Sequence, residues 1–203
     1  ALEYYEKSLK IREELGDKSG MGSSYNNIGI IYYEQGNYEK ALEYYEKSLK
    51  IAEELSDKIG MGKRFNNIGL IYDYQGNYEK ALEYYEKSLK IAEELGDKKG
   101  MGLSYNNIGN IYNDQGNYEK ALEYYEKSLK IREELGDKKG MGDSYNNIGN
   151  IYKEQGNYEK ALDYLLKSKN IYEEINVITN LDETAKALME VYEKLGNNKK
   201  ALE

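Results

Sequence analysis

A strict repeat of forty residues is the feature that most limits what this chain can fold into. The segment ALEYYEKSLKI recurs unchanged at residues 1–11, 41–51, 81–91 and 121–131, and NNIG recurs at 26–29, 66–69, 106–109 and 146–149. A fixed period of this size is typical of solenoids, in which each unit buries its apolar face against its neighbours. The sequence therefore predicts an array of stacked units.

Each unit contains two helical patterns. In the first, Met21, Tyr25, Ile28 and Tyr32 are spaced by four, three and four residues, so they lie on one side of a helix. The second pattern carries such a stripe at Tyr38, Ala41, Tyr45, Ser48, Leu49 and Ala52. We call these the first-type and second-type helices, and the unit is predicted to be a helical hairpin.

Glycine followed by Asn or Asp separates the helices, as in Gly36-Asn37 and Gly96-Asp97. Glycine adopts the left-handed conformation that ends a helix, and the Asn or Asp side chain caps the next one. Ser56 replaces this glycine in one turn, where we expect a strained positive φ that costs on the order of 1 kcal/mol.

The pattern predicts an all-α fold of about ten helices in a single solenoid over 1–203. A lone second-type helix occupies 1–16, and four full repeats follow at 17–56, 57–96, 97–136 and 137–176. Residues 177–203 are expected to form a degenerate capping helix and the start of the next helix.

The residues at these positions resemble the tetratricopeptide repeat, whose motif is aromatic-x-x-Leu-Gly-x-x-Tyr, then Gly-x-Tyr-x-x-Ala and a further aromatic. The unit at 57–96 matches with Phe65, Ile68, Gly69, Tyr72, Gly76, Tyr78, Ala81 and Tyr85. Ser88 replaces the usual Ala and Glu93 the usual closing Pro, so the unit lengthens from about 34 residues to forty. This longer form is similar to the repeats of spindle-orientation and kinesin-light-chain adaptors and of bacterial signalling proteins. The resemblance implies a right-handed α-solenoid whose first-type helices line a concave groove for a partner's peptide or helix.

Positions that differ between the units are concentrated on one face of the first-type helix. They are 23/63/103/143, 30/70/110/150, 33/73/113/153 and 34/74/114/154, and two Asn columns at 26 and 27 lie on or beside the same face. An Asn side chain both donates and accepts hydrogen bonds, so a ladder of Asn can hold an extended peptide backbone. The predicted peptide-binding residues, here called the groove set, are Asn27, Ile30, Tyr33, Lys63, Asn67, Leu70, Tyr74, Leu103, Asn107, Asn110, Asn113, Asn147, Asn150 and Lys153. The alternative is that this exposed face varies without constraint, while the Asn residues bond across adjacent helices.

Composition argues against most other functions. The chain has no Cys and no His, so it lacks a thiolate nucleophile, the commonest general base and the commonest metal ligand. We therefore expect no enzyme activity, no cofactor and no metal. A net charge of -8 disfavours nucleic acid as a partner, and no apolar run is long enough for a membrane span. A cytoplasmic protein is expected.

The glycine-rich stretch GMGSSYNNIG at 20–29 superficially resembles a dinucleotide-binding loop. Its sixth position is Tyr25, no strand precedes it, and it occurs four times. Gly20, Gly22 and Gly29 are better explained as packing spacers that let the helix approach its neighbours.

The repeat decays from residue 161 onward. We expect a capping helix begun by Asn180, with acidic residues in its first turn. Alternatively, Leu165 and Leu166 mark a docking surface for another domain or another copy. The uncapped helix at 1–16 offers an apolar face, so a homo-oligomer through the terminal helices is also possible.

The sequence thus favours a non-catalytic scaffold that binds a protein or peptide partner in the groove. Two alternatives remain. One is a structural or designed repeat array without a specific ligand, which self-associates through its ends. The other is the sensory module of a larger signalling protein.

Overall fold

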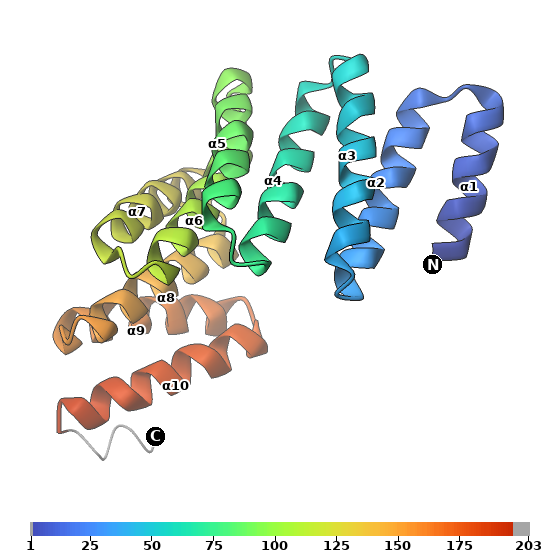
Figure 1. Ribbon diagram of the computed structural model, residues 1–203. Coiled ribbons are helices and arrows are strands. Elements are labelled where there is room, and N and C mark those ends of the chain that lie inside the picture. Colours follow the sequence, from blue (N-terminus) through green and yellow to red (C-terminus); the bar gives the residue numbers. More distant parts are fainter. Residues whose placement is uncertain (1, 197–203) are drawn as a thin grey trace. The chain divides into compact units, whose positions relative to one another are not determined.

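The computed structural model describes residues 2–196, which form an all-α solenoid of helical hairpins. Its ten helices are α1 (Leu2–Leu15), α2 (Lys18–Glu34), α3 (Tyr38–Glu54), α4 (Lys58–Tyr74), α5 (Tyr78–Leu95), α6 (Lys98–Asp114), α7 (Tyr118–Leu135), α8 (Lys138–Glu154), α9 (Tyr158–Glu174) and α10 (Ile178–Lys194). Within each of the two units described below, consecutive helices run antiparallel (Figure 1). The even-numbered helices are the predicted first-type helices and the odd-numbered ones the second-type helices.

The contacts within the chain divide it into two units, 1–100 and 101–203. In the first unit α2 pairs with α3 and α4 with α5, and α3 packs on α4. In the second unit α8 pairs with α9, while α7 packs on α8 and α9 on α10. Each unit is thus built as predicted, from hairpins that bury their apolar stripes against one another.

The core of each hairpin is made by the predicted stripes. Ile28, Ala41 and Tyr45 are buried, and the same positions are buried again at Ile68, Ala81 and Tyr85. The small residues at the contact allow close approach: a Cβ added at Gly29 would lie 2.7 Å from the Tyr45 ring. One at Gly22 would lie 3.1 Å from Ile51. These two glycines are confirmed as packing spacers, whereas a Cβ at Gly20 would meet chiefly the Asp17 carboxylate that caps the same helix and the Arg12 side chain.

The turns follow the predicted chemistry. Gly36 has a φ of 72°, and the Asn37 side chain accepts a hydrogen bond from the Lys40 backbone N–H. Ser56 has a φ of 54°, so the expected positive φ at a non-glycine residue is confirmed. Asn176, at the corresponding turn after α9, also has a φ of 54°. Asparagine tolerates this conformation better than most residues do.

The predicted start of the last helix was wrong. α10 begins at Ile178, with Val177 at the N-cap position and no side-chain hydrogen bond to cap it. The reason is that the forty-residue register persists: Asn176 takes the place of the turn glycine, so the helix begins two residues later whatever its cap. Asn180 instead lies in the first turn, and its Nδ2 donates to Asp143 Oδ1 at 3.0 Å.

The suggestion that Leu165 marks a docking surface was also wrong. Leu165 is fully buried in a core cluster with Ala161, Ala187 and Val191, because it replaces the buried Tyr of earlier repeats. Leu166 packs against the same cluster.

Candidate functional site

All members of the groove set lie on first-type helices, at positions that correspond from one repeat to the next. α2 carries Asn27, Ile30 and Tyr33, and α4 carries Lys63, Asn67, Leu70 and Tyr74. α6 carries Leu103, Asn107, Asn110 and Asn113, and α8 carries Asn147, Asn150 and Lys153. Lys63, Tyr74 and Leu103 are exposed, and the remaining members are half-buried.

The Asn residues form hydrogen bonds between successive first-type helices. In the first unit Asn67 Nδ2 donates to Asn26 Oδ1 at 3.3 Å, and in the second Asn147 Nδ2 donates to Asn106 Oδ1 at 3.4 Å. This is the structural role weighed as the alternative to ligand binding. An amide side chain has two N–H donors and two acceptor lone pairs, so one such bond leaves capacity for a further partner.

The first unit brings three tyrosines together at the end of this face. Tyr33 and Tyr74 meet edge to face with ring centroids 5.6 Å apart, and Tyr38 stacks on Tyr74 at 5.7 Å. Burial and a hydrogen bond with Tyr74 raise the pKa of the Tyr33 phenol above its ordinary value. Tyr74 is 59 % exposed, so much of its side chain is accessible to a partner.

In the second unit, several groove-set residues are engaged by the protein itself. Asn110 Oδ1 accepts a hydrogen bond of 2.7 Å from the Tyr125 hydroxyl, and Asn150 Nδ2 donates to the Asn146 carbonyl at 3.0 Å. Lys153 Nζ forms an ion pair of 2.6 Å with Glu190. The polar residues of this unit therefore contribute to packing as well as to the surface.

Asp143 stands at one of the positions that differ between the repeats, and one of its hydrogen-bond partners lies on the last helix, α10. Its carboxylate accepts hydrogen bonds from the Tyr172 hydroxyl at 2.7 Å and from Asn180, and it lies 4.0 Å from Arg132 Nη1. Burial and the hydrogen bond to Asp143 raise the pKa of the Tyr172 phenol. Three departures from the repeat, Asp143, Tyr172 and Asn180, thus form one network that joins α8, α9 and α10.

No helix within residues 2–196 is long and apolar enough to cross a membrane. In the same part of the chain, no three Asp or Glu side chains come together as a metal site would require.

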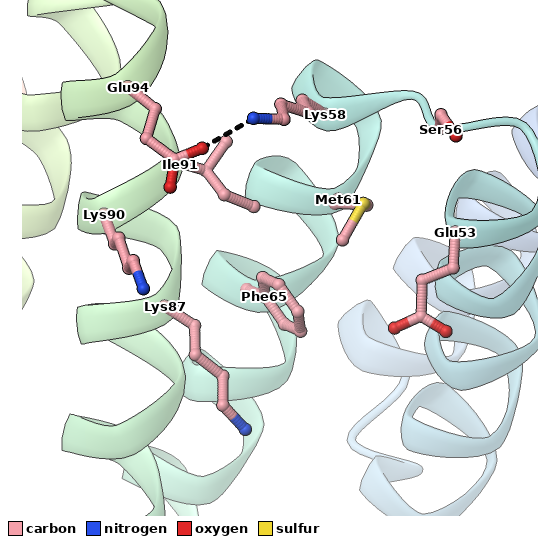
Figure 2. A pocket seen from close by; sticks show the side chains of 9 residues that line it. All are labelled: Glu53, Ser56, Lys58, Met61, Phe65, Lys87, Lys90, Ile91 and Glu94. Carbon is pink, nitrogen blue, oxygen red and sulfur yellow. Dashed lines mark hydrogen bonds and ion pairs between the residues drawn. The ribbon is translucent and has the colours of Figure 1, made fainter.

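Sequence reasoning missed a hollow on the surface of the first unit. It lies among α3, α4 and α5 and is floored by Met61, Phe65 and Ile91 (Figure 2). The sequence feature that could have indicated this hollow is Phe65, the single Phe of the chain, which stands where the other three units have Tyr.

Comparison with known proteins agrees with the helical hairpins. The family model described as "Tetratricopeptide repeat" matches residues 1–54, 20–94, 65–134, 100–174 and 141–203, which together span the chain. The chain belongs to the tetratricopeptide repeat family. This confirms the resemblance drawn from the sequence motif, and makes the molecule a protein-interaction repeat protein.

Three known proteins are similar to this chain in sequence or in fold. G-protein-signaling modulator 1 of Mus musculus is 42 % identical over 41 residues, which are 20 % of this chain and 6 % of that protein. The crystal structure of BtubC (BKLC) from P. vanneervenii matches with a TM-score of 0.87 at 22 % identity, covering 99 % of this chain and 85 % of that one. A STAND protein with a tetratricopeptide repeat sensor, from Pyrococcus horikoshii, matches with a TM-score of 0.83 at 28 % identity. The match covers 97 % of this chain and 32 % of that protein.

Proposed function

We propose that this chain is a cytoplasmic, non-catalytic scaffold that binds a partner's peptide or helix along the groove set. The observation that carries the proposal is the pairing, on one face of the first unit, of an Asn hydrogen-bond ladder with the exposed ring of Tyr74. The amides supply donors and acceptors for a partner's backbone, and the tyrosines supply apolar contact with a polar tip. Family membership supports this use of the first-type helices.

A selection from a peptide library, followed by calorimetric titration of the selected peptides, tests the proposal. Asn67→Ala and Tyr74→Ala are expected to weaken binding, because they remove a backbone partner and an aromatic contact. Glu86→Ala is the control, since Glu86 is exposed on the second-type helix α5. Thermal melts of each variant separate loss of binding from loss of the Asn67 to Asn26 bond. If the selected peptides bind the Asn67 and Tyr74 variants as tightly as the parent protein, the groove set is not the binding site.

A second candidate is a sensory module within a larger signalling protein. It is favoured by the likeness to the STAND protein, which has a tetratricopeptide repeat sensor. Sequencing the complete gene tests this, because a sensory role requires an ATPase or other output domain joined to the repeats. A gene that encodes repeats alone would rule it out.

A third candidate is self-association through α1. Its residues Tyr4, Ile11 and Leu15 are 79 %, 56 % and 75 % exposed. Light scattering over a range of concentrations tests it, with Ile11→Glu as the variant. A monomer at every concentration, or an oligomer unchanged by Ile11→Glu, would exclude this contact.

A further inference from the structure

The first unit carries aromatic and acidic residues together at the ends of two first-type helices. α2 ends with Tyr33 and Glu34, and α4 ends with Asp73 and Tyr74. In the forty-residue register Asp73 corresponds to Tyr33, and Tyr74 corresponds to Glu34. Each helix therefore contributes one phenol and one carboxylate, in opposite order. We call these four residues the tyrosine-acid cluster.

The rings of this cluster form a preformed aromatic surface. Tyr33 meets Tyr74 edge to face, and Tyr38, at the start of α3, lies 6.0 Å from Tyr33 and stacks on Tyr74. Aromatic pairs at such distances attract one another, so each ring holds its neighbours in place. The Tyr74 side chain nevertheless stays largely exposed. An ordered ring is thus accessible at this end of the groove set.

The charge beside these rings is negative. Glu34 is exposed, and within residues 2–196 its carboxylate has no hydrogen bond or ion pair. Burial raises the pKa of the Tyr85 phenol, and the nearby Asp73 charge raises it further. The Tyr85 hydroxyl is completely buried without a hydrogen-bond partner in the described chain, so its oxygen adds unused acceptor capacity next to Asp73. These groups favour a cation.

The basic residues nearest in sequence lie against other rings. Lys40 Nζ is 5.0 Å from the centroid of Tyr32, and Lys80 Nζ is 4.9 Å from that of Tyr72. Tyr32 and Tyr72 belong to separate stacks, with Tyr44 and Tyr84. Neither lysine is paired with a carboxylate of the tyrosine-acid cluster in the described chain.

The second unit has no such cluster. The corresponding positions hold Asn113, Asp114, Lys153 and Glu154, none of which is aromatic. Lys153 Nζ pairs with Glu190 at 2.6 Å and lies 3.8 Å from Glu154. The second unit therefore supplies a cation of its own where the first supplies a ring or a carboxylate.

We propose that the tyrosine-acid cluster recognises an arginine side chain of the peptide or helix bound along the groove set, an inference that rests on the proposed function. The guanidinium stacks on the exposed part of Tyr74 and donates hydrogen bonds to Glu34 or Asp73. Arginine suits this surface better than lysine, because its planar group combines a flat face for an aromatic ring with N–H donors for a carboxylate. The net charge of -8 draws basic partners toward the protein.

Tyrosine ring NMR tests the recognition directly. The probe is N-acetyl-arginine-N′-methylamide, and its uncharged match is the citrulline derivative. The arginine probe is expected to shift the Tyr74 signal, assigned with Tyr74→Phe, saturably and at lower concentration than the citrulline probe. Tyr4 is the control ring, because it is exposed on α1 next to Glu3. No saturable shift at Tyr74, equal binding of the two probes, or an equal response at Tyr4 overturns the proposal.

Charge variants test the two carboxylates. Glu34→Gln and Asp73→Asn are each expected to weaken the arginine probe about twofold to fivefold, as for an exposed ion pair, and to leave the citrulline probe unchanged. Glu154→Gln is the matched control, since Glu154 stands at the position of Glu34 in the second unit. An affinity for the arginine probe that is unchanged in the Glu34→Gln, Asp73→Asn double variant would refute the pairing.

Peptides selected on the groove set separate this inference from the proposed function. They are expected to contain an arginine whose replacement by citrulline weakens binding to the parent protein but not to the double variant. Peptides that depend on Asn67 yet tolerate citrulline would refute the arginine site and leave the groove set standing. An arginine probe that binds at Tyr74 while no selected peptide depends on Asn67 would do the reverse.

Discussion

The Tyr85 hydroxyl allows a test of how much a buried polar group without a hydrogen-bond partner changes the free energy of unfolding. It is completely buried and has no hydrogen-bond partner, whereas the corresponding Tyr125 hydroxyl donates to Asn110 at 2.7 Å. The difference arises because Leu70 stands where the later repeat has Asn110. Burial, with the nearby Asp73 charge, raises the pKa of the Tyr85 phenol, so it stays neutral.

Removing the two hydroxyls should therefore have opposite effects. A buried donor without a partner costs about 1–3 kcal/mol, and a typical satisfied hydrogen bond contributes about 1 kcal/mol. Tyr85→Phe is expected to raise the free energy of unfolding by about 1 kcal/mol, after the small loss of packing around the removed oxygen. Tyr125→Phe is expected to lower it by about 1 kcal/mol.

Urea unfolding followed by far-ultraviolet circular dichroism measures both variants in the same chain. Unfolding of repeat arrays is not always all-or-none, so the midpoints are compared only where the slopes agree. The reasoning is refuted if Tyr85→Phe destabilises the protein as much as Tyr125→Phe does. A double-mutant cycle adds a second check: Leu70→Asn should cost less in the parent protein than in the Tyr85→Phe background, because only the parent has a hydroxyl for the new amide.

Three further predictions concern turns, caps and pH. Ser56→Gly should stabilise the protein by about 0.5–1 kcal/mol by relieving a positive φ, and Gly96→Ser should destabilise it similarly; equal denaturation midpoints for the two would contradict this. Val177→Asp should add a side-chain cap to α10 and stabilise by about 1 kcal/mol, whereas Asp137→Ala should remove the cap of α8; hydrogen exchange in the first turn of each helix measures both. Burial raises the pKa of Tyr45 to about 12, so the folded state holds its proton longer than the unfolded state. The associated stability is complete below pH 10 and is lost between about pH 10 and pH 12, which alkaline unfolding followed by tyrosinate absorbance will show or refute.

Much of the local structure could be read directly from the sequence. The apolar stripe of the first-type helix, which includes Ile28, that of the second-type helix, which includes Tyr45, and the turn pair Gly36-Asn37 predict helices and turns because each depends on spacing within a short segment. Because the chain has four full repeats, each prediction can be checked at four corresponding places. The start of α10 could not be read in this way, since Asn180 is a good cap residue by type but lies inside the helix that the register imposes.

For the candidate site, the sequence predicted only which face of the first-type helices carries it. The repeat places the groove set on the first-type helices, but the sequence does not show which members are engaged by the protein. Asn110 and Lys153 have partners within the chain, whereas the Tyr74 ring stays exposed. These outcomes depend on which neighbour each side chain meets across a helix pair.

The sequence by itself determined the period, the helical hairpin, the turn residues and the family, because each follows from spacing along the chain. The tertiary structure decided how departures from the repeat compensate one another. Arg12 bonds Ser24 between α1 and α2, and Arg64 bonds Ser48 between α3 and α4. These two arginines occupy different positions of the repeat, yet each places a guanidinium between a second-type helix and the first-type helix that follows it. Only packing brings such positions together, because side chains far apart in sequence meet only when the helices pack against each other.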